Sequence, residues 1–292
     1  MLKSIKLFLY PWPHAELNCG LLDVNEPFKP LDYGAFLNQE QQNYKPICSN
    51  RIMKKETQKT LLIVTIYAIA MGFLESIVVI YLRKLYYPNG FDFPLKGFID
   101  PSVLSIEWVR EFFTIVMLIT IGLLAGKKFY SKLAYFVYSF AIWDIFYYLF
   151  LKAYLNWPSS LITWDLLFLI PWPWIGPVLA PLLCTILMIF TTFIILNFED
   201  QDKNIKINIK EWSLIILGII LILYTWLYDY GKLIISNGYA KEFFTLATNQ
   251  EFYSILTSYN PTYYNWPIFI LGLTLSTLGI LLFYLRTKRK VY

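Results

Sequence analysis

Two carboxylic acids lie inside long apolar runs of this sequence. Glu75 interrupts the run MGFLESIVVIYL, and Asp144 interrupts the run AIWDIFYYLF. An ionisable group is costly to dehydrate, so its presence in hydrocarbon is first interpreted as a functional site. Such a carboxyl group can bind a cation, exchange a proton or act as a general acid. Glu75 and Asp144 are therefore the first candidates for a functional centre.

Further charged residues stand at helical spacing near these two acids. Arg110 is the nearest cation in expected membrane depth. Glu107 shares a helix face with Arg110 by i,i+3 spacing and with Glu111 by i,i+4 spacing. We expect Arg110 to pair with one of the two buried acids and to leave the other free.

Two tyrosines and another acid complete the candidate site. Tyr147 and Tyr148 follow Asp144 by i+3 and i+4 spacing, so either hydroxyl can hydrogen-bond its carboxyl group. Asp165 lies in a short apolar segment further along the chain. The alternative interpretation is a buried Glu–Arg–Asp cluster that fixes helix register and does no chemistry. The candidate intramembrane polar site comprises Glu75, Glu107, Arg110, Glu111, Asp144, Tyr147, Tyr148 and Asp165.

Other common kinds of active site find no support in the sequence. The only histidine is His14, which argues against a Ser–His triad and against a histidine metal site. The three cysteines, Cys19, Cys48 and Cys184, show neither metal-ligand spacing nor a disulfide pattern. We see no phosphate-binding loop and no nucleophile with its base. We therefore expect no metal and no cofactor.

Composition indicates that the lipid bilayer is the main partner of this chain. Hydrophobic residues make up 57% of the 292 residues and charged residues only 15%, whereas soluble domains carry roughly a quarter. The 23 Tyr and 10 Trp suit a protein with two water–lipid interfaces. The net charge of +5 sits in short loops between apolar runs, so it indicates topology and not nucleic-acid binding.

Six apolar runs are long enough to cross a bilayer, which takes about 20 residues of helix. They must be helices, because lipid offers no hydrogen-bond partner to an open backbone. We predict an all-α, polytopic membrane helix bundle with spans at residues 60–82, 108–126, 132–153, 174–197, 211–230 and 266–285. Lys and Arg concentrate in alternate, short loops, so the positive-inside rule places both ends of the membrane domain in the cytoplasm. The expected location is the inner, or plasma, membrane.

The loop between the third and fourth spans reads NWPSSLITWDLLFLIPWPW. Residues 161–170 are apolar but too short to cross the bilayer, and Pro171 and Pro173 block continuation of a helix. We predict a short interfacial or re-entrant helix on the outer side, capped by Ser159 or Ser160.

Residues 1–52 differ from the membrane domain that we assign to residues 53–292. They are interrupted by proline, and the apolar stretch after Lys6 stops at Pro11, which argues against a signal peptide. Met53 precedes two lysines and a long apolar run. We expect residues 1–52 to be a poorly ordered extension upstream of the true translation start. The competing interpretation is a short ordered cytoplasmic arm.

The run from the third to the fourth span resembles a family of uncharacterised prokaryotic multi-pass membrane proteins. The resemblance rests on WDIFYY, on TWDLLFLIPWPWIGPVLAP, on the segment GFLES around Glu75 and on the segment YYPNGF after the first span. It covers about residues 60–285. It implies a membrane domain that stands alone, and it brings no activity with it because none is established for the family.

Three functions remain open from sequence. The first is binding or transport of a small hydrophobic or ionic ligand in an outward-facing acidic and aromatic pocket. The second is a membrane enzyme that acts on a lipid or isoprenoid by acid catalysis, with Glu75 or Asp144 as proton donor. The third is an accessory or assembly protein that holds a partner through its aromatic loops. The sequence does not choose between enzyme and non-enzyme, and it leaves the oligomeric state open.

Overall fold

The computed structural model describes residues 53–95, 101–201, 203, 205–239 and 250–289. Six of its helices are long and apolar enough to cross a membrane, which confirms the predicted all-α polytopic bundle. The expectation for residues 1–52 lies outside the described residues. The long helices are α2 (Lys55–Tyr86), α3 (Pro101–Ala125), α4 (Phe129–Leu155), α5 (Leu179–Asp200), α6 (Ile209–Ser236) and α8 (Trp266–Arg289).

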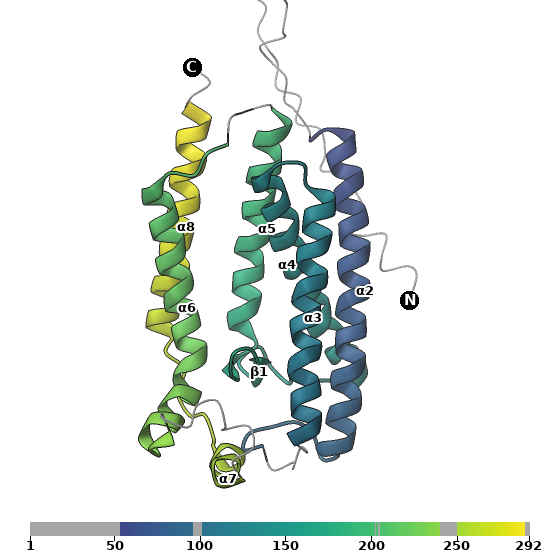
Figure 1. Ribbon diagram of the computed structural model, residues 1–292, viewed down its shortest axis with the longest axis vertical. Coiled ribbons are helices and arrows are strands. Elements are labelled where there is room, and N and C mark those ends of the chain that lie inside the picture. Colours follow the sequence, from purple (N-terminus) through teal and green to yellow (C-terminus); the bar gives the residue numbers. More distant parts are fainter. Residues whose placement is uncertain (1–52, 96–100, 202, 204, 240–249, 290–292) are drawn as a thin grey trace, which may run out of the picture. The chain divides into compact units, whose positions relative to one another are not determined.

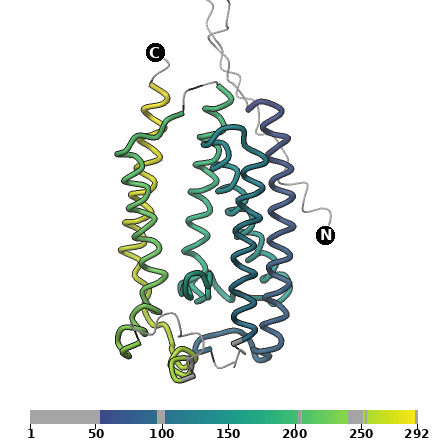
Figure 2. The backbone as a smooth tube through the Cα atoms, in the orientation of Figure 1, coloured from purple at the N-terminus to yellow at the C-terminus, as the bar shows by residue number. Residues whose placement is uncertain are grey.

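The long helices form two groups (Figure 1). In the first group α4 packs against α2, α3 and α5, and in the second group α6 packs along α8. Contacts between α5 and α8 are sparse by comparison. The tube in Figure 2 shows the same separation between the α6–α8 pair and the other four long helices.

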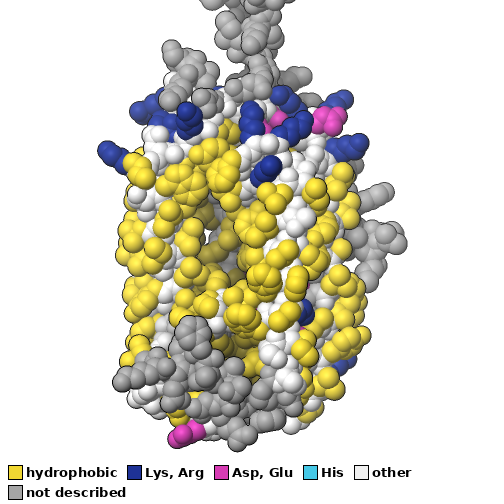
Figure 3. Space-filling view, in the orientation of Figure 1, with side chains coloured by type: hydrophobic (Ala, Val, Ile, Leu, Met, Phe, Trp, Pro, Cys, Tyr) yellow, Lys and Arg dark blue, Asp and Glu magenta, His cyan; other side chains and the backbone are white. Residues whose placement is uncertain are grey.

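The two ends of the bundle differ in charge. Lys and Arg side chains gather at the upper end in Figure 3, where α2 begins and α8 ends. We name this the basic end. The opposite end carries the short helix α7 (Gln250–Ser258) and two short strands, and we name it the hairpin end. Between the ends the surface is covered by apolar side chains, as expected of helices that face lipid.

Small residues bring α6 and α8 close together. A Cβ atom at Gly218 of α6 would collide with Ser276 and Gly272 of α8, with the backbone nitrogen of Ser276 at only 2.8 Å. A Cβ atom at Gly272 would lie 2.7 Å from the carbonyl oxygen of Gly218. Close backbone approach of this kind stabilises helix pairs in membranes, where lipid removes the hydrophobic driving force. The α6–α8 pair is therefore a tightly packed unit.

The predicted short helix at residues 161–170 is wrong. This segment forms strand β1 (Trp164–Phe168), which pairs antiparallel with β2 (Trp174–Pro177). The two strands satisfy each other's backbone groups, and the pairing is extended where Leu179 N donates to Leu161 O at 2.8 Å. An apolar run this short fits a strand as well as a helix, and its β-propensity is high at Trp and Phe.

The two serines that we expected as helix caps form a turn instead. Ser159 Oγ lies 3.0 Å from Thr163 Oγ1, and the Ser160 backbone N–H donates to the same hydroxyl at 3.1 Å. The fourth span consequently begins at Leu179, after the hairpin, and not at residue 174 as predicted.

Gly218→Ala tests the close packing of α6 on α8. The added methyl group forces the two helices apart, so the free energy of unfolding falls by roughly 1–3 kcal/mol. Thermal unfolding of the purified protein in micelles measures the loss. Gly231→Ala is the matched control on the same helix, because a Cβ atom there meets nothing within 4 Å. Equal melting temperatures for the two variants would contradict the packing argument.

Candidate functional site

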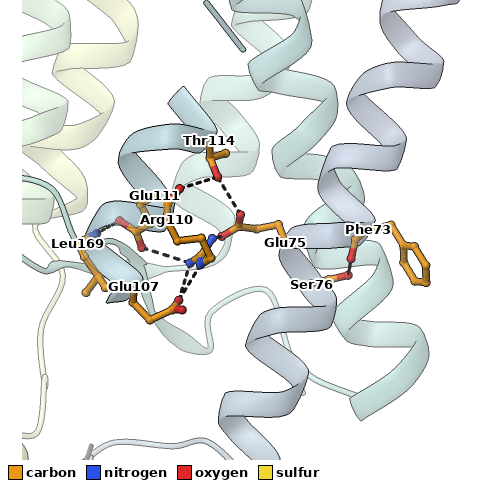
Figure 4. Close-up of polar contacts among 8 residues, drawn as sticks. All are labelled: Phe73, Glu75, Ser76, Glu107, Arg110, Glu111, Thr114 and Leu169. Carbon is orange, nitrogen blue, oxygen red and sulfur yellow. Dashed lines mark hydrogen bonds and ion pairs between the residues drawn. The ribbon is translucent and has the colours of Figure 1, made fainter. Parts of the chain in front are cut away.

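A cluster of charged side chains lies between α2 and α3, towards the hairpin end (Figure 4). We name it the Arg110 cluster: Glu75 from α2, with Glu107, Arg110, Glu111 and Thr114 from α3. The Arg110 guanidinium forms an ion pair with Glu75. Its Nε donates to Glu107 Oε2 at 2.8 Å, and its Nη2 lies 4.0 Å from Glu111 Oε1. Arg110 therefore serves three carboxyl groups at once.

The second oxygens of Glu75 and Glu111 also have partners. Thr114 Oγ1 lies 3.3 Å from Glu75 Oε2 and can donate to it. The backbone N–H of Leu169, in the loop between β1 and β2, donates to Glu111 Oε2 at 2.7 Å. The indole of Trp108 donates in turn to the Leu169 carbonyl oxygen at 3.1 Å. Because both Glu75 oxygens are engaged, its carboxyl group is held in place and is poorly suited to bind another molecule.

A second ion pair, which the sequence analysis missed, links α2 to the hairpin. Arg83 Nη2 donates to Asp165 Oδ1 at 3.0 Å, and both side chains are buried, with 7% and 1% exposed. The other oxygen, Asp165 Oδ2, accepts the Tyr148 hydroxyl at 3.1 Å. Of the two tyrosines that the spacing offers to Asp144, Tyr148 therefore bonds Asp165 instead.

The Arg83 guanidinium lies between two aromatic rings. Its carbon Cζ is 3.7 Å from the ring centroid of Trp157 and 4.1 Å from that of Phe91. Aromatic faces attract a desolvated cation. Long basic side chains near helix ends usually reach water, so the position of Arg83 in the sequence does not mark it as a buried cation. The aromatic residues around it were the one available signal that it turns inward.

These two ion pairs line a small cavity of about 130 Å³. It extends from Phe91, in the loop after α2, to Asp144 in the middle of α4. Five carboxyl groups and two guanidinium groups line it. Among the described residues no set of three or more His, Cys, Asp or Glu side chains is arranged to hold a metal ion. The charged lining comprises Glu75, Arg83, Glu107, Arg110, Glu111, Asp144 and Asp165.

Asp144 differs from every other acid in this lining. Its Oδ2 atom is buried and has no hydrogen-bond partner in the described part of the chain. The sequence predicts that Arg110 pairs with one buried acid and leaves the other unpaired, and the geometry fits this: Arg110 takes Glu75. A buried polar atom without a partner is costly, so it calls for a specific explanation.

Asp144 also borders a second, larger cavity. This cavity has a volume of about 420 Å³ and lies between the two helix groups, with walls from α3, α4, α5, α6, α8 and the hairpin. The described wall is almost wholly apolar, and its titratable side chains are Asp144 and Cys184. Figure 3 shows a hollow lined by apolar side chains on this face.

The aromatic residues of the large cavity supply hydrogen-bond donors. Trp143 and Trp174 line the cavity, and their indole nitrogens are buried without a described partner. The ring of Trp174 stacks on that of Trp226 from α6, with centroids 5.4 Å apart. The indole nitrogen of Trp226 is likewise buried without a described partner, so the wall includes one unpaired acceptor, on Asp144, and three unpaired donors within an apolar surface.

The structure thus brings all eight predicted residues to one region but divides their roles. Glu75, Glu107, Arg110 and Glu111 form the Arg110 cluster, while Asp165 and Tyr148 belong to the Arg83 ion pair. Asp144 and Tyr147 line the small cavity between them, and Asp144 alone of the eight also lines the large one. Comparison with protein-family models, with curated proteins and with solved structures finds no match to this chain.

Arg110→Leu tests whether Arg110 holds its cluster together. The change leaves three carboxyl groups without their shared cation, and removal of one partner from a buried ion pair costs roughly 3–5 kcal/mol. Unfolding in micelles, compared with Arg289→Leu at the exposed end of α8, measures this loss. The double variant Glu75→Leu/Arg110→Leu should regain part of it. A single variant as stable as the control would contradict the assignment.

The buried carboxyl group of Asp165 should make the free energy of unfolding of this protein depend on pH. Burial raises the pKa of Asp165 to about 6, although the ion pair with Arg83 opposes this rise. The folded protein then holds the proton more tightly than the unfolded chain, whose aspartates titrate near about 3.9. The stabilisation is complete below that value and is lost as the pH rises through about 6.

The measurement is the melting temperature of the wild type minus that of Asp165→Asn, across the same pH range. This difference should increase as the pH falls from neutral towards the ordinary aspartate value. A flat difference, or one of opposite slope, would show that Asp165 does not titrate in this way.

Proposed function

We propose that this membrane protein binds an apolar, lipid-like molecule in the large cavity, with Asp144 as its main polar contact. The observation that carries the proposal is the unpaired Asp144 Oδ2 atom at the wall of an otherwise apolar cavity. A bound molecule that donates a hydrogen bond would satisfy this oxygen, and its apolar body would fill the space beside it.

The lining favours a ligand that carries a hydroxyl group. A hydroxyl both donates, as Asp144 requires, and accepts, as the indole N–H groups of Trp143 and Trp174 require. Lipophilic alcohols, such as isoprenoid alcohols, combine this group with a chain that matches the aliphatic and aromatic wall. Amphiphiles with a neutral amine have the same capacity and belong to the same class.

The division of the bundle supports access from the membrane. The cavity lies where the α6–α8 pair meets the other helix group through comparatively few contacts, and the hollow is visible on the lipid-facing surface. A ligand from the bilayer therefore needs no aqueous path. Hydrophilic solutes and inorganic ions fit less well, because the wall between Asp144 and the basic end carries few groups that would replace their water.

A second function, acid catalysis on the same ligand, is favoured by one specific feature. Asp144 is free of hydrogen bonds at Oδ2 and faces apolar walls, which suits transfer of a proton to an alkene or alcohol in the absence of bulk water. Glu75 is the weaker of the two proton donors named from sequence, because both of its oxygens are engaged.

We place the basic end in the cytoplasm and the hairpin end on the outer side, in the inner or plasma membrane. The support is the concentration of Lys and Arg at one end, which the positive-inside rule assigns to the cytoplasm. Both ends of the six-helix domain then lie on the cytoplasmic side, and the small cavity faces outwards.

Photo-crosslinking with a diazirine analogue of farnesol tests the proposed binding. The full chain in lipid nanodiscs should be labelled on α5 or α6 residues that line the large cavity, such as Met188 or Leu223. Excess farnesol should reduce the labelling more than farnesane, its hydrocarbon counterpart, because only the alcohol can donate to Asp144. Asp144→Asn should reduce this difference, because a neutral amide oxygen is a weaker acceptor than a carboxylate.

Glu251→Gln provides the matched control, since it changes an exposed acid on α7 to its amide. Labelling that is insensitive to Asp144→Asn, or equal competition by farnesol and farnesane, would overturn the proposal. Such a result would favour the accessory function, in which the intramembrane acids have only a structural role.

A further inference from the structure

Asp144 stands where the two cavities meet. Four residues line both of them: Trp143 and Asp144 of α4, and Leu167 and Phe168 of β1. Of these four, Asp144 is the ionisable one. Its carboxyl group therefore has the charged small cavity on one side and the apolar large cavity on the other.

The small cavity leads from Asp144 towards the hairpin end. Its lining includes Tyr87 and Phe91 beyond the end of α2, and Leu104 in the first turns of α3. Its volume of about 130 Å³ has room for several water molecules, since one occupies roughly 30 Å³ in the liquid. Charged side chains along the wall offer such water the polar partners that it needs.

The large cavity offers no comparable path to the basic end. Apart from Asp144 and Cys184, the described residues of its wall carry no titratable group, and their polar hydroxyls are engaged with backbone carbonyls. A proton that reaches or leaves Asp144 consequently finds its polar surroundings on the hairpin side.

We propose that the small cavity is a proton route between the hairpin end and Asp144, and that occupancy of the large cavity is coupled to proton exchange along it. The first half concerns the protein alone. The second half rests on the proposed function, because it requires a ligand beside Asp144. The unpaired, buried Asp144 oxygen at the inner end of the small cavity is the group that this route would serve.

Charged and titratable groups lie near Asp144 on α2, α3, α4, α5 and β1, and the described wall residues from α6, α8 and β2 add none. The guanidinium groups neutralise part of the acidic lining, so the net charge along the cavity neither repels a proton nor traps it. Those groups are Glu75 and Arg83 on α2, Glu107, Arg110 and Glu111 on α3, Tyr147 and Tyr148 on α4, Asp165 on β1 and Cys184 on α5.

Protonation would allow Asp144 to donate a hydrogen bond to a ligand instead of only accepting one. The ionised carboxylate only accepts, so it pairs with a hydroxyl or amine donor. The protonated acid can donate, so it favours an ether, carbonyl or alkene partner instead. Uptake of a proton from the hairpin side thereby weakens the binding of ligands that donate a hydrogen bond. It strengthens the binding of ligands that accept one.

Infrared spectroscopy of the full chain in lipid tests the proton route without any ligand. Asp144→Asn identifies the carboxylic C=O band of Asp144 by its disappearance, and transfer to deuterated buffer gives the exchange rate of its proton. Val79→Phe fills part of the small cavity. Because an excess proton is costly to carry through apolar surroundings, we expect exchange at least about tenfold slower.

Val137→Phe is the matched control, since it makes the same substitution in the wall of the large cavity alone. It should leave the exchange rate close to that of the wild type. Leu104→Phe narrows the small cavity from a different helix and replaces Val79→Phe if that variant fails to fold. Exchange at the wild-type rate in a folded variant with a filled small cavity would overturn the proton route.

The coupling has its own readout. Crosslinking of the farnesol analogue should change with pH in the wild type and become independent of pH in Asp144→Asn. Crosslinking that does not vary with pH in the wild type would refute the coupling. Absence of specific crosslinking would refute the proposed binding, while the exchange measurement would still decide the proton route.

Discussion

The arrangement of this protein depends on the need to give each dehydrated carboxyl group a partner. Arg110 meets that need for Glu75, Glu107 and Glu111, and Arg83 meets it for Asp165. These ion pairs join α2 to α3 and α2 to the hairpin. They also leave Asp144 as the acid without a partner at Oδ2, which makes it the one most available to a ligand.

The membrane domain was predictable because its signal is local. Each span is a continuous apolar run, and the length of hydrocarbon that must be crossed fixes the length of the helix. The association of Arg110 with Glu75 could also be predicted from the sequence, since both residues stand at similar depth in their spans. By contrast, the partner of Arg83 lies 82 residues away in sequence, on a strand that the sequence did not reveal.

The hairpin and the large cavity could not be predicted for two different reasons. A short apolar run such as residues 161–170 fits a strand or a helix, and only its pairing with residues 174–177 decides between them. The large cavity is a property of the spacing between two helix groups. That spacing follows from the close packing of Gly218 on Gly272 within one group and from sparse contacts between the groups.

The hairpin touches both helix groups at the same end of the bundle. Asp165 and Leu169 fasten it to α2 and α3, whereas Gly176 lies so close to Trp226 of α6 that a Cβ atom would be 3.1 Å from the indole ring. Asp165 and Gly176 are direct partners across the two strands, so the ladder spacing of about 5 Å fixes the distance between the two attachments. The hairpin thus acts as a clamp of constant width: residues added to the connection after Leu169 would leave that width unchanged, whereas a slip of the strand register would alter it.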